Sequence, residues 1–144
     1  MRHAAMRLAA ALSILLFAFV AASSANASVC NTTTAPGGFI YQTNNWYQRS
    51  TTTAGTLSGT VYYVSWSWPN YTPWTPTLQL KICLNNTCGI VSGSQAPGSD
   101  TVVWAGITGN PTVTVYVQNA SNPTRALNPA ISGSGNFSVS VCSQ

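Results

Sequence analysis

The segment Val113-Thr114-Val115-Tyr116-Val117-Gln118 decides the fold class, because valine occupies every second position and polar or amphipathic residues lie between. Successive side chains of a β-strand point to opposite faces, so this period of two gives one apolar and one polar face. The same alternation occurs in segments 78–83 and 137–142. These three segments predict antiparallel strands that each bury one face against a core.

Weaker strand patterns and regularly spaced turn residues extend this prediction along the chain. Gly, Pro and Asn clusters recur at intervals of roughly 10 residues, and no segment beyond residue 27 has the period of a helix. Segment 32–36 is expected to be a loose leading segment, and 133–135 a strand break. Further strands are predicted at 38–48, 57–68, 88–92, 101–107 and 125–131. The sequence therefore predicts an all-β fold, an antiparallel β-sandwich of immunoglobulin-like size with about seven to eight strands.

The first 27 residues have the features of a signal peptide. Two arginines, Arg2 and Arg7, precede an apolar run at 8–22, and Ala25-Asn26-Ala27 has the small-x-small pattern of a cleavage site. The run of about 15 residues is shorter than the roughly 20 that a membrane-spanning helix needs. We therefore expect cleavage before Ser28, a single β-sandwich domain at 28–144 without a membrane span, and a periplasmic or secreted location.

Acidic side chains and histidine are almost absent from the predicted mature chain. It contains one acidic residue, Asp100, and no histidine, since His3 lies in the predicted signal peptide. Glycoside hydrolysis usually needs two carboxylates, a Ser-His-Asp triad needs an imidazole, and metal sites need clusters of His, Cys or carboxylate ligands. We therefore expect no catalytic residues, no metal site, no cofactor and no enzymatic activity, and we expect Asp100 to cap a turn or a strand.

Positive charge is also sparse and scattered. The mature chain would carry only Arg49, Lys81 and Arg125. Nucleic-acid binding usually depends on a cluster of Lys and Arg that neutralises phosphates, so nucleic acid is not an expected partner. Lys81 falls on the polar side of its strand and is expected to lie in water.

Four cysteines remain after the predicted cleavage, and an exported protein favours pairing them. Three connectivities are possible. Cys83 and Cys88 flank an Asn-Asn-Thr turn, so a bridge across this hairpin is the simplest choice, and it leaves Cys30 to pair with Cys142. The alternation of apolar residues places Cys83 and Cys142 on the polar side of their strands, so both bridges are expected to lie outside the core as structural cross-links.

Aromatic residues divide into core and interface candidates. Trp66 and Trp104 lie within apolar alternation and are expected in the core, with Tyr62 predicted on the same strand face as Trp66. Amphipathic rings near proline-rich turns suit contacts with a protein or a glycan. The candidate interface residues are therefore Trp68, Tyr71 and Trp74.

The order of several motifs resembles that of the flagellar FlhE family, over residues 57–141. Leu57-Ser58-Gly59 opens a strand with Trp66, a turn at 73–76 precedes the strand 78–83, Cys88 follows Cys83 after four residues, and 125–131 precedes the last strand. The resemblance implies a non-enzymatic, β-rich periplasmic protein. It would act as a chaperone or as a regulator or plug of the flagellar type III export apparatus, with export or rod components as partners.

Two other function classes stay open from the residues themselves. The content of Tyr, Trp, Asn and Thr is typical of a secreted carbohydrate-binding or adhesive module. Exposed loops on a rigid, disulfide-bonded sandwich would also suit a small inhibitor of secreted hydrolases.

Overall fold

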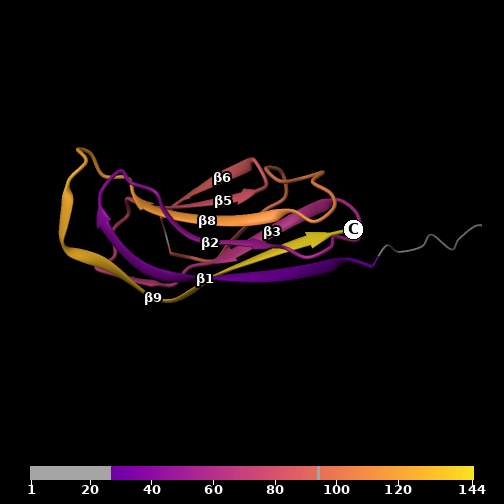
Figure 1. Cartoon of the computed structure of the whole chain (residues 1–144), viewed down its shortest axis with the longest axis horizontal. Helices are drawn as coiled ribbons and strands as arrows, with labels where there is room; N and C mark the ends of the chain where they lie inside the picture. Colours follow the sequence, from indigo (N-terminus) through magenta and orange to yellow (C-terminus); the bar gives the residue numbers. More distant parts are fainter. Residues whose placement is uncertain (1–26, 94) are drawn as a thin grey trace, which may run out of the picture.

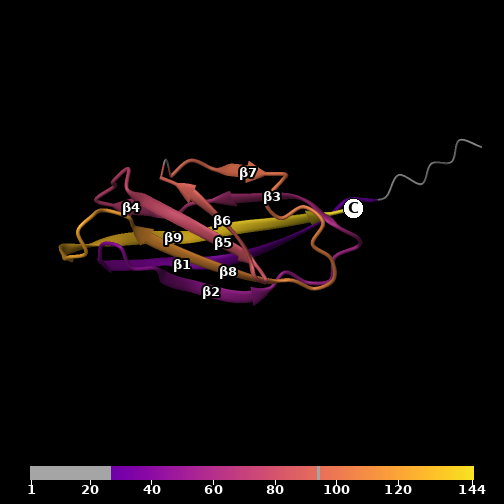
Figure 2. The same ribbon diagram turned by 90° about the horizontal axis from the view of Figure 1, so that it is seen from above.

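The computed structural model describes residues 27–93 and 95–144, which form two antiparallel β-sheets packed face to face. Figure 1 shows β5, β6 and β8 in one layer and β1 and β9 in the other, and Figure 2 shows the same sandwich from above. Residues 1–26 of the predicted signal peptide lie outside the described residues. Among the described residues, no helix has the length and apolar character that a membrane crossing requires.

The first sheet has five strands, and its central strand is the last in the sequence. The order is β1-β9-β3-β7, and β4 also pairs with β9. Because β9 is 18 residues long, it pairs with β1 along one side and with both β3 and β4 along the other. The strands are β1 (Val29–Gln42), β3 (Val61–Ser67), β4 (Asn70–Thr72), β7 (Gly98–Asp100) and β9 (Ala126–Ser143).

The second sheet has four strands in the order β2-β8-β5-β6. Its members are β2 (Tyr47–Thr53), β5 (Leu78–Leu84), β6 (Thr87–Ser92) and β8 (Thr112–Asn119). The tight β5–β6 hairpin turns at Asn85, whose φ of 53° lies in the left-handed region that asparagine tolerates better than most residues. The predicted disulfide-bonded, all-β antiparallel sandwich is confirmed, and the described residues form nine strands rather than seven to eight.

The core lies between the sheets and follows the alternation seen in the sequence. Val113, Val115 and Val117 of β8 are all at most 1% exposed, whereas the residues between them are half-buried. Burial of a side chain of this size contributes roughly 1.5–3 kcal/mol relative to exposure. The five-stranded sheet supplies the facing side chains, including Val64, Phe137, Val139 and Val141.

Two segments that were predicted to lie outside strands, the leading segment 32–36 and the break at 133–135, belong to strands. Residues 32–36 belong to β1, because they pair with β9 despite their polar and proline content. Gly133 lies within β9, where the strand passes close to Tyr71: a Cβ at Gly133 would lie 2.5 Å from Tyr71 Cε1. The glycine therefore permits a close approach between strands, which a sequence pattern does not distinguish from a turn.

Other predicted strand boundaries were also wrong. The expected strand at 38–48 is divided, because β1 ends at Gln42 and β2 begins at Tyr47. Most of 101–107 forms turns instead of a strand. Asp100 Oδ1 accepts hydrogen bonds from the backbone N–H groups of Val102 and Val103, both at 2.7 Å. This capping turns the chain away from the sheet and leaves Val102 77% exposed.

A register shift in β3 changes the expected position of Tyr62. The shift lies between Val61 and Tyr63, so Val61 and Val64 are both buried although they are three residues apart. Tyr62 is half-buried, and its hydroxyl is hydrogen-bonded to the Ser28 hydroxyl at 2.7 Å in an exposed position. The prediction that Tyr62 shares the core face with Trp66 was wrong, because a bulge reverses the alternation at this point.

Both disulfides join residues that face each other on neighbouring antiparallel strands. Cys30 of β1 pairs with Cys142 of β9, and Cys83 of β5 pairs with Cys88 of β6, with Sγ–Sγ distances of 2.02 and 1.98 Å. This is the predicted connectivity. Cys83 and Cys142 alternate with core residues and lie outside the core cluster, but they are only 5% and 4% exposed, so these side chains are covered and not solvated.

Candidate binding groove

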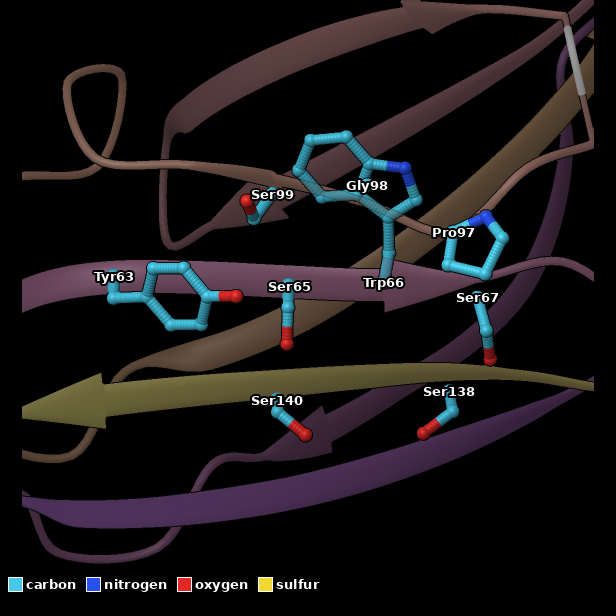
Figure 3. Close-up of a pocket in the computed structure, with 9 residues that line it drawn as sticks. All are labelled: Tyr63, Ser65, Trp66, Ser67, Pro97, Gly98, Ser99, Ser138 and Ser140. Atoms are coloured by element: carbon cyan, nitrogen blue, oxygen red, sulfur yellow. The ribbon is translucent and has the colours of Figure 1, made fainter.

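A groove floored by serines crosses the outer face of the five-stranded sheet (Figure 3). Strand β3 contributes Ser65 and Ser67, and the adjacent β9 contributes Ser138 and Ser140. Ser65 lies opposite Ser140, and Ser67 lies opposite Ser138. These serines alternate with core residues, so their side chains point away from the core to a common surface. Because serine side chains are short, the floor of the groove lies below the larger residues around it.

Larger residues surround this floor. Tyr63 lies at one end with its hydroxyl directed toward Ser65, while Pro97, Gly98 and Ser99 form a wall along β7. The groove encloses about 400 Å³. A Cβ at Gly98 would lie 2.7 Å from Trp66 Cζ2, so glycine allows β7 to lie directly against the indole ring.

The hydroxyls continue in rows across neighbouring strands. Thr32 of β1 lies opposite Ser140, and their hydroxyl oxygens are 2.6 Å apart. Ser65 in turn lies opposite Ser99 of β7. One row therefore crosses four strands, and its hydroxyl side chains belong to Thr32, Ser140, Ser65 and Ser99.

The groove supplies hydrogen bonds without charge. Among the nine described residues that line it, none is a carboxylate, an imidazole, an amine or a thiol. Each hydroxyl can both donate and accept a hydrogen bond. Among the lining residues, Trp66 has a buried indole Nε1 that has no hydrogen-bond partner among the described residues. This chemistry suits binding of a neutral polar ligand, and the lining has no acid–base pair.

Metal coordination has no candidate cluster in the described part of the chain. No group of three or more His, Cys, Asp or Glu side chains lies together there. The single carboxylate, Asp100, accepts two backbone hydrogen bonds through one oxygen at the end of β7. Its geometry is that of a turn cap.

The three predicted interface residues lie in different environments. Trp74 is 51% exposed in the proline-rich segment after β4. Trp68 is half-buried and packs on Phe137 with ring centroids 5.8 Å apart. Tyr71 is only 1% exposed, so its prediction as an interface residue was wrong. As the middle residue of β4, it faces the core because neighbouring strand residues alternate.

Tyr71 makes a specific buried contact between two strands. Its hydroxyl donates a hydrogen bond to the carbonyl oxygen of Gly37 at 2.7 Å. Burial raises the pKa of Tyr71 to about 12, although the nearby Arg49 acts in the opposite direction. The phenol therefore stays neutral well above the pH at which an exposed tyrosine ionises.

Trp66 and Trp104 lie in the core, in edge-to-face contact with centroids 6.2 Å apart. Trp104 Nε1 donates to the carbonyl oxygen of Thr87 at 3.1 Å, whereas Trp66 is also among the residues that line the groove. Sequence reasoning missed the groove. Its only signal was the run of outward-facing serines, which by itself also describes an ordinary solvated strand face.

The outer face of the other sheet is covered by longer side chains. Lys81 Nζ lies 4.5 Å from the ring centroid of Trp46 and 4.3 Å from that of Tyr116. Lys81 is half-buried, so the expectation that it lies freely in water was wrong. Attraction between the ammonium and the two ring faces explains this position.

A second depression lies beside the turn that carries Trp74. It encloses about 470 Å³ and includes Pro73, Thr75 and Arg125. The side chain of Asn119 on its wall accepts hydrogen bonds from the Thr77 hydroxyl at 2.7 Å and from the Ser121 backbone N–H at 3.1 Å. The Asn119 side chain therefore organises the surrounding loops.

Comparison with known proteins adds one structural match. No protein-family model and no curated protein matches the chain. A solved structure described as the crystal structure of FlhE aligns with a TM-score of 0.64 and 18% sequence identity, over 81% of this chain and 97% of that chain. The chain has an FlhE-like fold. The resemblance predicted from the order of motifs is thereby confirmed for the fold, since a likeness at this identity concerns architecture.

Proposed function

We propose that the protein is an exported accessory protein of the flagellum that acts, as the FlhE resemblance implies, as a chaperone or regulator of the type III export apparatus. The fold match carries this proposal, because it spans nearly the whole of FlhE and most of this chain. The partner would be an export or rod component outside the cytoplasm.

Export and an oxidising location are part of the proposal. The signal peptide at 1–27 would deliver a mature domain at 28–144 to the periplasm, or alternatively to the exterior. Both disulfides join directly opposed residues and fit a compartment in which cystines persist.

Action by binding, without catalysis, is consistent with the arrangement of the functional groups. Asp100 caps a turn, and the serine groove has no acid–base pair in its lining. The exposed Trp74, beside the depression that includes Arg125, supplies a ring and a cation of the kinds enriched in protein interfaces.

Site-specific crosslinking in the source organism tests the proposal. A photo-crosslinking residue at position 74 should capture an export or rod component, whereas the same residue at position 102, which is also exposed, should not. Deletion of the gene should alter flagellar assembly or swimming. Normal flagella in the deletion strain, together with no flagellar component crosslinked from position 74, would contradict the proposed function.

A further inference from the structure

Six hydroxyl side chains converge on the groove of the five-stranded sheet. Four belong to the serine floor, and Tyr63 and Ser99 add two from its rim. We propose that this groove is a binding site for a neutral saccharide. The proposal concerns a surface distinct from the Trp74 turn and does not depend on the flagellar role.

The floor has the spacing of a regular sheet. Adjacent strands lie about 4.8 Å apart, and residues i and i+2 of one strand are about 7 Å apart. The four serine hydroxyls, on Ser65, Ser67, Ser138 and Ser140, therefore form a grid on the scale of a sugar ring. A saccharide hydroxyl donates and accepts as a serine hydroxyl does, so each pair can match in either direction.

The absence of charge from the lining selects against ionised ligands. A bound anion or cation would lose its hydration without meeting an opposite charge among the nine described lining residues. An extended peptide is also disfavoured, because peptides usually add to a free sheet edge. The groove instead lies on the face of β3 and β9, both of which pair with strands on either side.

Trp66 gives an independent indication of a ligand. Trp66 is among the residues that line the groove and is only 9% exposed, and its buried indole N–H has no acceptor among the described residues. A buried donor without an acceptor is costly in free energy. The indole lies against Gly98, and the lack of a side chain at this glycine allows β7 to approach the ring closely. Because Nε1 is buried in this structure, the proposal requires a shift of the three-residue strand β7 that lets a ligand oxygen accept this hydrogen bond.

The size of the groove limits the ligand and its affinity. A volume of about 400 Å³ lies at the small end of the range for ligand sites and fits one or two sugar rings. Tyr63 at the end offers an amphipathic ring on which a sugar face can pack. Since the groove is shallow, we expect dissociation constants on the order of 1 mM.

Titration of the isotope-labelled, oxidised protein tests this site by NMR. The probes are hexasaccharides of β-1,4-linked glucose and of N-acetylglucosamine, with a galacturonic acid hexamer as the charged comparison. At least one neutral probe should shift the backbone signals of the serine floor and move the Trp66 indole N–H signal downfield. The charged hexamer should not shift the backbone signals of the serine floor or the Trp66 indole N–H signal.

Variants separate the groove from the rest of the surface. Ser138→Leu fills the floor and should weaken binding about tenfold or more, while Ser140→Ala removes one hydroxyl with little change in shape and should weaken it by about threefold. Thr114→Leu, at a half-buried outward position of β8, is the matched control and should bind normally. Unfolding curves verify that each variant is folded.

Three results would overturn the saccharide site. The first is the absence of shifts with both neutral hexasaccharides at about 20 mM. The second is equal binding by Ser138→Leu and Thr114→Leu. The third is a response to the charged hexamer alone. A failed flagellar crosslinking experiment would leave the NMR result unaffected, so the two proposals fail separately.

Discussion

The two sheets differ in how far apart in the sequence their paired strands lie. Every pairing in the five-stranded sheet joins strands that are not consecutive, whereas the four-stranded sheet contains the hairpin of β5 and β6. Their disulfides follow the same division. Cys30–Cys142 has a sequence separation of 112, and Cys83–Cys88 has a separation of 5, although both connect directly opposed residues. The two disulfides therefore have similar local geometry but restrict the entropy of the unfolded chain by different amounts.

The outer faces of the sheets differ as well. Short serines leave the five-stranded sheet hollow, while Trp46, Lys81 and Tyr116 lie in contact on the four-stranded sheet. The hollow face presents serine hydroxyls to a ligand, one of which, on Ser140, is also hydrogen-bonded to Thr32. On the covered face, the Lys81 ammonium instead contacts two aromatic rings of the protein. This difference is the reason why we propose ligand binding on the five-stranded sheet, whereas the contacts on the four-stranded sheet stabilise the fold.

The largest effect is expected from the long-range disulfide. Replacement of both Cys30 and Cys142 by alanine should lower the free energy of unfolding by about 4–5 kcal/mol, because the unfolded chain regains the entropy of a very long loop. Urea denaturation of the oxidised protein measures this loss. A change below about 1 kcal/mol would show that the pairing of β1 with β9 already supplies the constraint.

The hairpin disulfide should matter less. The double replacement Cys83→Ala with Cys88→Ala should cost about 2 kcal/mol by the same loop-entropy relation. It is the matched control for the first variant, since both remove a bridge between opposed strand residues. A loss of unfolding free energy equal to or larger than that of the Cys30 and Cys142 variant would contradict the expected difference between the two disulfides.

Alkaline pH should destabilise the five-stranded sheet through Tyr71. Its pKa is raised from 10.0 to about 12 in the folded protein, so between these values the unfolded state binds fewer protons and stability falls as pH rises. The loss attributable to Tyr71 should reach about 1 kcal/mol by pH 11, as the difference in unfolding free energy between pH 8 and pH 11.

Two phenylalanine variants isolate this effect. Tyr71→Phe should reduce stability at pH 8, because it removes the hydrogen bond to Gly37, but it should also remove the Tyr71 part of the alkaline loss. Tyr41→Phe, at a tyrosine that is 56% exposed, should retain the full alkaline loss. Equal pH dependence in both variants would contradict the role of Tyr71.

The smallest effect is expected on the covered face. Lys81→Gln should lower the free energy of unfolding by about 0.5–1 kcal/mol, because the ammonium loses its contacts with the rings of Trp46 and Tyr116. Arg125→Gln, at an exposed cation, is the control and should change stability by less than about 0.5 kcal/mol. Equal losses in the two variants would argue against the ring contacts.

Strands with strong alternation were predictable from the sequence, and strands defined by their partners were not. Val113, Val115 and Val117 face the core as expected, because burial of one face requires that pattern. The beginning of β1 has no such pattern, and pairing with β9 supplies its hydrogen bonds. The residues after Asp100 have strand-like composition, but the aspartate carboxylate binds their N–H groups and forms a turn instead.

The groove depends on strand order, which local sequence patterns do not contain. Ser65 and Ser140 are 75 positions apart in the sequence and lie opposite each other only because β9 is adjacent to β3. Trp66 was expected in the core from its neighbours, and that reasoning gave no sign that the residue also lies beside a groove. Tyr71 was misassigned because a three-residue strand within a proline-rich region is too short to show alternation.

The position of β9 has a consequence for biosynthesis. Because β1, β3 and β4 all pair with β9, these three strands are synthesised before the strand that they pair with. Until residues 126–143 emerge, only the four-stranded sheet has its full set of strands. Such a nascent chain would remain incompletely folded for longer than one whose early strands pair with each other, because its first sheet closes only when the last strand is made.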